Sequence, residues 1–272
     1  MITKNGKQFK FGLQCLVLND IDFMEAMLRT FQPFIDRILV SIDEQSWLKD
    51  VKSDGKAEKL VKKLQKEFDN IEYVKGVWKN ETDQRNEALN TLKDCEYVFI
   101  VDVDEMWSSG DINNVQKYIL EHRGDVTVFM ANWNTRFKKL NWRIHPREQF
   151  KPVVVIDSKK GLKFGKSRDV LQTEKAAFNL IPENLLMIEH FSYVRSEDSK
   201  IKEKIQTFAH ATEIVNGADW WYENIYLPAT ISSMYLHPTN PEAYHGLIEE
   251  PLHPEIKATL KKYSPKLFKD DK

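Results

Sequence analysis

Short apolar runs alternate with amphipathic segments along residues 11–105 of this 272-residue chain. Nearly all-apolar runs of this length are typical of strands in a parallel sheet, because helices cover both faces of such a sheet. The amphipathic segments between the runs predict those helices. We therefore expect an α/β fold with a Rossmann-like, mostly parallel central sheet. The predicted strands cover 11–19, 36–43, 70–77 and 97–105, and the predicted helices cover 20–34, 55–68 and 82–93.

The pattern changes after about residue 110, where the apolar runs lose their regular alternation. We expect a mixed-sheet and helical continuation, and a Pro- and Lys-containing tail that covers the surface. No internal repeat or low-complexity linker divides the chain, so a single domain over residues 1–272 is expected. The expected strands are 126–137, 151–157 and 187–195, the expected helices 199–215 and 223–236. The expected parts of the domain are a ligand-binding half at 1–110, a second half at 111–236 and the tail at 237–272.

Composition argues against several classes of protein. The formal net charge of −1 provides no general basic field for nucleic acid or anionic membranes. Cys15 and Cys95, the two cysteines of the chain, both lie in apolar runs and are expected to be buried free thiols. The N-terminal residues lack the apolar stretch of a signal peptide, and no apolar run is long enough to cross a membrane. We therefore expect a cytoplasmic protein without membrane insertion.

The fourth predicted strand ends in the acidic sequence Asp102-Val103-Asp104-Glu105. On an extended strand Asp102 and Asp104 would share one face, where two carboxylates repel each other unless a cation compensates. Mg²⁺ or Mn²⁺ would suit this position, since Mg²⁺ favours one or two carboxylates together with substrate phosphates. Structural alternatives exist: Asp102 would begin a turn, and Glu105 would either support the site or cap the next helix.

The order of motifs over residues 11–110 resembles the N-terminal half of a family 2-like glycosyltransferase of the GT-A fold. The matching elements are a second strand ending in Asp43, a helix carrying Gln84-Arg85-Asn86-Glu87-Ala88, and a strand ending in Asp102-Val103-Asp104. The resemblance implies a metal-dependent enzyme that moves a sugar from a nucleotide-sugar donor, expected to be a UDP-sugar, to an acceptor hydroxyl. The implied cofactor is Mn²⁺ or Mg²⁺.

The resemblance also implies roles for individual residues. Asp43 matches a family acid that hydrogen-bonds the nucleobase of the donor. Arg85 matches an arginine near the nucleobase and the phosphates. Asp104 would bind the metal, while Asp102 would contact the ribose or a metal-bound water. His190 matches a later residue that completes the metal shell, so the implied metal group is Asp102, Asp104 and His190. Further donor-binding candidates are Leu18, Asn19, Asp83 and Gln84.

Several of these residues have structural alternatives. Asp43 is also a typical turn former, and Arg85 is also expected to form a surface salt bridge. A lone histidine such as His190 is often a hydrogen-bonded core residue. Arg195 and Lys204 are either contacts of the diphosphate or ordinary solvated charges.

The resemblance is incomplete in the second half of the chain. Inverting members usually carry a Glu-Asp pair that supplies the catalytic base, and no such pair occurs between residues 130 and 190. The candidates that remain for the base are Glu148, Asp157 and Glu189, beside the catalytic Asp104. Whether the anomeric configuration would be inverted or retained therefore stays open.

The acceptor and two other functions also stay open. The segment 132–150 mixes Trp133 and Trp142 with basic residues and predicts either strands that cover the sheet or an acceptor platform. The acceptor would be a glycan or another hydroxyl compound, with modified DNA as an alternative. A nucleotidyltransferase is disfavoured, because the loop after the first strand lacks the glycines that hold a triphosphate. The third hypothesis is a non-catalytic glycan- or nucleic-acid-binding module.

Overall fold

The computed structural model describes residues 2–4, 7–48, 50–207 and 210–268. A seven-stranded sheet in the order β14-β8-β11-β6-β3-β4-β5 forms its centre. The four strands from the first part of the chain are parallel, and β11 is antiparallel to both of its neighbours. The predicted α/β fold class is confirmed. The strands are β3 (Phe11–Val17), β4 (Arg37–Asp43), β5 (Ile71–Gly76), β6 (Tyr97–Ile100), β8 (Val128–Met130), β11 (Val153–Asp157) and β14 (Phe178–Leu180).

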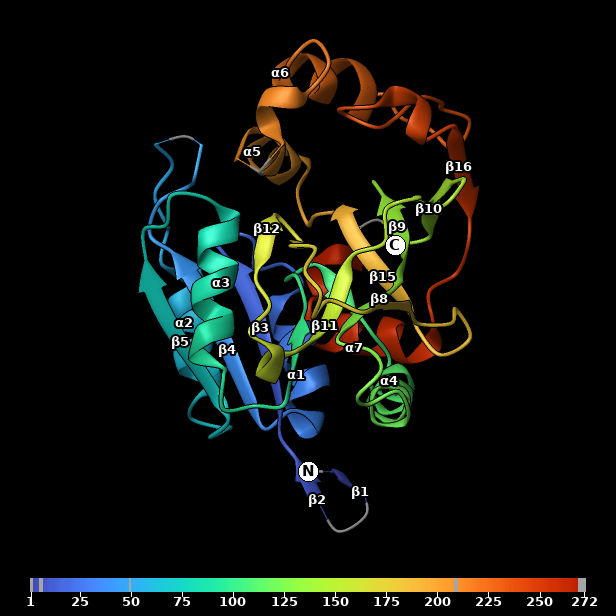
Figure 1. Cartoon of the computed structure of the whole chain (residues 1–272). Coiled ribbons are helices and arrows are strands. Elements are labelled where there is room, and N and C mark those ends of the chain that lie inside the picture. The colour runs from blue at the N-terminus through green and yellow to red at the C-terminus, as the bar shows by residue number, and fades with distance from the viewer. Residues whose placement is uncertain (1, 5–6, 49, 208–209, 269–272) are drawn as a thin grey trace.

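Helices cover both faces of this sheet (Figure 1). In β4, Ile38, Val40 and Ile42 face one apolar cluster, while Leu39 between them faces the other. This alternation places α1, α2, α4 and α7 on the first face and α3 on the second. The helices are α1 (Met24–Phe31), α2 (Lys56–Leu64), α3 (Glu81–Thr91), α4 (Ser109–Glu121) and α7 (Pro254–Tyr263).

A second sheet has five strands in the order β16-β10-β9-β15-β7. Two further helices, α5 (Asp198–Thr207) and α6 (Ala218–Trp221), lie at the end of the molecule toward which β3 and β4 run (Figure 1). The strands of the second sheet are β7 (Glu105–Met106), β9 (Asn132–Phe137), β10 (Trp142–His145), β15 (Met187–Tyr193) and β16 (Gly246–Glu249). Two short hairpins pair β1 (Ile2–Lys4) with β2 (Lys7–Phe9) and β12 (Phe164–Lys166) with β13 (Asp169–Val170).

Two of the predicted strands are each divided between the two sheets. The predicted strand 97–105 leaves the central sheet after Ile100, and residue 105 begins β7 in the second sheet. A turn joins the two parts, with the Glu105 N–H donating to the Asp102 carbonyl oxygen at 3.0 Å. The prediction that Asp102 and Asp104 share one face of a strand is therefore wrong. The predicted strand 126–137 divides in the same way into β8 and β9.

The C-terminal part of the chain differs from its prediction. The predicted helix 223–236 ends early, in a π-helical turn at Tyr222–Tyr226, because Pro228 has no N–H for a helical hydrogen bond. The helix expected at 199–215 is described as far as Thr207, residues 208–209 lie outside the described residues, and a 3₁₀ turn follows at Ala211–Glu213. The tail does more than cover the surface, since it supplies β16 and the core helix α7. Short 3₁₀ turns lie at Gln32–Phe34, Ser158–Lys160, Ala211–Glu213, Pro241–Ala243 and Pro265–Phe268.

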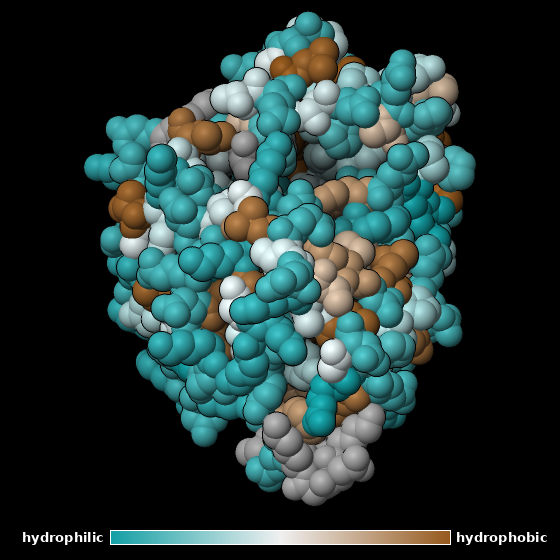
Figure 2. Space-filling model, in the orientation of Figure 1, coloured by the Kyte–Doolittle hydropathy of each residue, from teal (hydrophilic) through white to brown (hydrophobic). Residues whose placement is uncertain are grey.

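Burial and surface agree with the composition. Both cysteines are buried and free, as predicted. The face shown in Figure 2 is mainly hydrophilic, with apolar residues in small separate groups. Among the helices of the described ranges, none combines the length and the apolar character that a membrane crossing requires.

Candidate active site

Residues from three strands meet at one edge of the central sheet. Because β3, β4 and β6 are parallel, their carboxyl ends lie side by side, which is where ligands bind in open α/β sheets. Asp43 is the last residue of β4, Asn19 follows β3, and Asp102 and Asp104 follow β6. Arg85 reaches the same edge from α3 and contacts Asp102. These five polar residues therefore lie at one edge of the central sheet.

Asp102 lies between two arginines. Its Oδ1 is 2.8 Å from Arg85 Nη2, and its Oδ2 is 3.1 Å from Arg168 Nη1. Burial raises the pKa of Asp102, but the nearby Arg85 and Arg168 outweigh burial and lower it to about 2. The neighbouring Glu105 is fully buried, pairs with Arg168 and accepts a 2.8 Å hydrogen bond from Trp133 Nε1. Glu105 therefore supports the acidic turn and is not a helix cap; the N-cap of α4 is Ser108.

Asp104 points to a different set of partners. Its Oδ2 is 2.8 Å from Arg195 Nη2 and 2.6 Å from Lys204 Nζ. Its Oδ1 is 4.0 Å from His190 Nε2. Burial raises the pKa of Asp104, but Lys204, Arg195 and His190 together hold it well below the usual range. Arg195 also pairs with Asp20, so each carboxylate of this cluster faces a basic side chain.

The imidazole of His190 is fixed from several sides. Its Nδ1 lies 3.2 Å from Thr135 Oγ1 and 3.8 Å from Glu148 Oε2, and its ring stacks on Trp133 with centroids 4.2 Å apart. Glu148 in turn accepts hydrogen bonds from the hydroxyls of Thr135 and Tyr244. Metal-binding histidines are held in this manner, with the second ring nitrogen facing a carboxylate or hydroxyl. The other ring nitrogen, Nε2, faces the Asp104 carboxylate.

The predicted group of three metal ligands is not assembled; of its members, Asp104 and His190 face each other, with Asp104 Oδ1 4.0 Å from His190 Nε2. Asp102 faces two arginines, and among the described residues no three His, Cys, Asp or Glu side chains form a metal-holding group. One carboxylate oxygen and one imidazole nitrogen suit Mn²⁺, while Mg²⁺ accepts imidazole less readily. Such a cation would need phosphate oxygens and water for its remaining positions.

Only one of the three predicted base candidates, Glu148, approaches this group. Asp157 pairs with Tyr97 at the start of β6, at the opposite end of that strand from Asp102, and accepts a hydrogen bond from the Lys159 N–H. Glu189 lies on the face of β15 opposite to its neighbour His190. Its carboxylate is bonded to Arg136 at 2.6 Å. Asp157 and Glu189 are therefore not part of the cluster.

Asp43 is buried at the end of β4, and polar atoms of several nearby residues are buried as well. Its Oδ1, Trp47 Nε1, Gln84 Oε1 and Arg85 Nη1 are all buried and have no hydrogen-bond partner among the described residues. Burial raises the pKa of Asp43 to about 7. Buried polar atoms are paired in most proteins, so several unpaired ones in neighbouring residues mark a place where water or a ligand is bound. Asp83, by contrast, is exposed on the first turn of α3.

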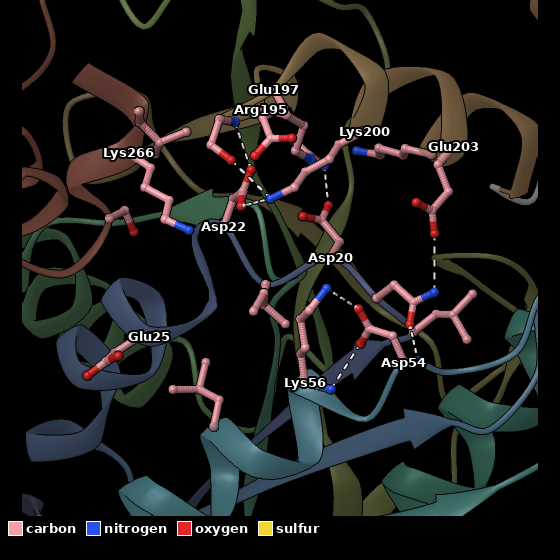
Figure 3. Close-up of a pocket in the computed structure, with 18 of the residues that line it drawn as sticks. Asp20, Asp22, Glu25, Asp54, Lys56, Arg195, Glu197, Lys200, Glu203 and Lys266 are labelled. Atoms are coloured by element: carbon pink, nitrogen blue, oxygen red, sulfur yellow. Dashed lines mark hydrogen bonds and ion pairs between the residues drawn. The ribbon is translucent and has the colours of Figure 1, made fainter. Parts of the chain in front are cut away.

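A cavity of about 560 Å³ lies beside this edge, next to α5 (Figure 3). Leu18 and Asn19, which follow β3, line one side of it, and Arg195 and Lys204 line another. Helix α5 is attached across the cavity: Glu203 accepts a 3.2 Å hydrogen bond from the Asn19 amide, and other residues of this helix contact the acids beyond β3 and β6. Two predicted donor-binding residues thus share one cavity with two basic residues that bond Asp104.

Arg168 contacts two of these acids and was not among the residues predicted from the sequence. It is buried, contacts Asp102 and Glu105, and donates to the carbonyl oxygens of Ile100 and Val153. No local pattern marks it, because it lies in the loop between β12 and β13 and reaches the acids only through the tertiary fold.

Arg168→Met is expected to lower the free energy of unfolding by about 3–5 kcal/mol, because it leaves the carboxylate of Glu105 buried without its cation. Urea unfolding at neutral pH measures the change. The matched control is Arg147→Met, whose exposed pair with Glu183 at 3.4 Å is expected to contribute less than about 1 kcal/mol. Equal effects of the two substitutions would show that Arg168 does not compensate buried charge.

Comparison with known proteins gives a likeness of folds. No protein-family model and no curated protein sequence matches the chain. Similar solved structures include S. aureus TarS 1-349 (TM-score 0.48, 16% identity, 77% of this chain and 66% of that chain). They also include TarS 1-349 in complex with UDP-GlcNAc (0.43, 16%, 77% and 67%). A third is glucosyl-3-phosphoglycerate synthase from Mycobacterium tuberculosis with Mg²⁺ and UDP (0.35, 11%, 46% and 44%). At these scores the activity has to be argued from the residues of this chain.

Proposed function

We propose that this chain is a metal-dependent glycosyltransferase that moves a sugar from a nucleoside diphosphate donor, a UDP-sugar, to an acceptor hydroxyl. The observation that carries the proposal is the placement of Asp104 Oδ1 4.0 Å from His190 Nε2, at the sheet edge where Asp43 and Arg85 are also buried. Buried charged clusters in a cleft are typical of functional sites, since apolar residues would hold a fold together at lower cost.

The basic residues around Asp104 support binding of a diphosphate. Arg195 and Lys204 both contact Asp104 and both line the 560 Å³ cavity. Phosphate oxygens are good acceptors for a guanidinium and for an ammonium group. A divalent cation held by Asp104 and His190 would add charge neutralisation of the departing nucleoside diphosphate. In this proposal Arg195 and Lys204 bind the phosphates from the cavity.

The unpaired atoms beside Asp43 support binding of the nucleobase at the same edge. A carboxylate accepts the N–H of a base, and Arg85 Nη1 offers a donor that is otherwise unpaired in the described part of the chain. Asn19, which follows the neighbouring strand β3, lines the 560 Å³ cavity. Base and diphosphate would then lie on successive strand ends, from β4 through β3 to β6.

A second cavity, of about 830 Å³, supports an acceptor site. It adjoins the first at Arg195 and is lined by Trp142, with the Lys139 ammonium 4.7 Å from the centre of the Trp142 ring. Trp142 is itself buried, so an acceptor in this cavity would meet its polar lining, which includes Asn141, Glu250 and Lys257. Such side chains suit a glycan or another hydroxyl compound. The other predicted platform residue, Trp133, is buried against His190 and is not available to an acceptor.

The test is a screen of nucleoside diphosphates and nucleotide-sugars with and without MnCl₂, followed by thermal unfolding and assay of donor hydrolysis. UDP with Mn²⁺ is expected to stabilise the protein by about 2.7 kcal/mol at a hundredfold excess over Kd, with a smaller effect when EDTA is present. A protein that no nucleotide stabilises, with or without metal, would contradict the proposal and favour a binding module.

A further inference from the structure

A second network of buried charged side chains lies in the second sheet, on the face of β15 opposite to His190. Arg136 of β9 is fully buried and bonds both oxygens of Glu189, with Nε 2.6 Å from Oε2 and Nη2 2.9 Å from Oε1. Its third nitrogen, Nη1, donates to the backbone carbonyl oxygen of Glu250, which follows β16. Buried ion pairs hold a fold together at higher cost than apolar residues do, so this network points to a role beyond packing.

The side-chain carboxylate of Glu250 is held by two hydrogen bonds. Arg143 Nε donates to its Oε2 at 2.9 Å, and Asn134 Nδ2 donates to its Oε1 at 2.6 Å. Arg136 Nη2 adds positive charge 3.5 Å from Oε1. Burial raises the pKa of Glu250, but the hydrogen bonds from Asn134 and Arg143 outweigh burial and lower it. The carboxylate is therefore ionised at neutral pH, and it serves as a fixed hydrogen-bond acceptor.

Glu250 is the place where this network reaches a cavity. Its side chain is 29% exposed and lines the 830 Å³ cavity, which adjoins the 560 Å³ cavity at Arg195. Among the described residues of the network, Glu250 alone lines the larger cavity. A carboxylate oxygen has two acceptor positions, and each Glu250 oxygen receives one hydrogen bond from the described part of the chain. One position on each oxygen is therefore left for a molecule in the cavity.

We propose that Glu250 recognises the acceptor by a pair of adjacent hydroxyls, each of which donates to one oxygen of its carboxylate. This inference rests on the proposed function and deepens it, because it names the acceptor class as a vicinal diol, a group that sugars and polyols carry. Hydrogen bonds to a charged acceptor are stronger than those between neutral groups. A molecule with separated hydroxyls fills one of the two positions and is expected to bind more weakly. Because Arg143 and Asn134 already fix the carboxylate, little side-chain freedom is lost on binding.

The experiment compares two isomeric acceptors: propylene glycol, whose hydroxyls are adjacent, and trimethylene glycol, whose hydroxyls are one carbon further apart. Each is added to the protein with MnCl₂ and the nucleotide-sugar that the protein hydrolyses, and product analysis gives the ratio of transfer to hydrolysis. The wild type is expected to give a ratio about tenfold higher with propylene glycol. Glu250→Gln is expected to lose this preference while it still hydrolyses the donor, since the amide nitrogen accepts no hydrogen bond.

The matched control is Glu189→Gln, which weakens the same network at a residue that does not line the cavity. This variant is expected to keep the preference for adjacent hydroxyls. A loss of the preference in both variants would show that Glu250 acts only through the structure of the sheet, which would overturn the inference.

The outcomes separate this inference from the proposed function. If the wild type hydrolyses the donor but uses both glycols equally, or uses neither, the inference is overturned and the proposed function stands. The same holds if Glu250→Gln keeps the wild-type preference, and the comparison of the two glycols with the wild type decides the inference if this variant does not fold. If the wild type neither binds nor hydrolyses any nucleotide-sugar, both the proposed function and the inference fail.

Discussion

Asp104→Asn is expected to lower the rate of sugar transfer by about a thousandfold or more. The amide is a weaker metal ligand and carries no charge, so stabilisation of the leaving diphosphate worth several kcal/mol would be lost. The substitution preserves the shape of a side chain that is 4% exposed. Steady-state transfer assays across MnCl₂ concentrations measure the loss, and Asp50→Asn, an exposed carboxylate on the loop after β4, is the control.

The same substitution is also expected to destabilise the fold by about 3 kcal/mol, because Arg195 and Lys204 lose the buried carboxylate that both contact. Urea unfolding therefore accompanies the assay, and rates are compared below the unfolding transition. Adding Lys204→Gln to the Asp104→Asn variant is expected to restore part of the stability without restoring transfer. Near-normal turnover by Asp104→Asn would remove the basis of the metal assignment.

The parallel half of the fold follows from local sequence. Its strands are apolar on both faces, as β3 shows with seven consecutive buried residues, and the helices between them carry one apolar side. Such periodicity is a property of neighbouring residues, so a single sequence contains it. The polar residues that follow these strands lie together because parallel strands bring their carboxyl ends to one edge.

The division of strands between two sheets has no local signature. Val101 and Val103 continue the apolar pattern of β6, yet Glu105 pairs with His190, far along the chain, in the second sheet. The resulting turn directs Asp102 and Asp104 to different partners, which is why their shared face was predicted wrongly. Arg168 illustrates the same limit, since its acidic partners Asp102 and Glu105 lie more than sixty residues away in sequence.

Asp157, one of the predicted base candidates, lies away from Asp102 and Asp104 for a topological reason. The segment 151–157 was expected to be a strand, and it is one, but β11 runs antiparallel to β6. Its carboxyl end therefore lies at the opposite edge of the sheet from Asp102. Strand direction depends on connections and packing, which the composition of a strand does not reveal.

Asp43→Asn is expected to stabilise the protein above pH 7 while weakening nucleotide binding. Burial raises the pKa of Asp43 in the folded protein from 3.8 to about 7, so folding favours the protonated carboxyl. The protonated Asp43 side chain makes its full contribution to the free energy of unfolding below pH 3.8. This contribution is lost as the pH rises toward the folded-state pKa of about 7. The loss is on the order of 4 kcal/mol at full effect.

The neutral amide of the variant carries no such penalty, so the gain in the free energy of unfolding is expected to grow between pH 4 and 7 and then level off. Urea unfolding of both proteins at several pH values measures the difference, in which contributions from the other carboxylates cancel. A difference that does not change with pH would show that Asp43 titrates normally. If the variant is more stable but no longer binds UDP, the Asp43 carboxylate destabilises the fold and is needed for nucleotide binding.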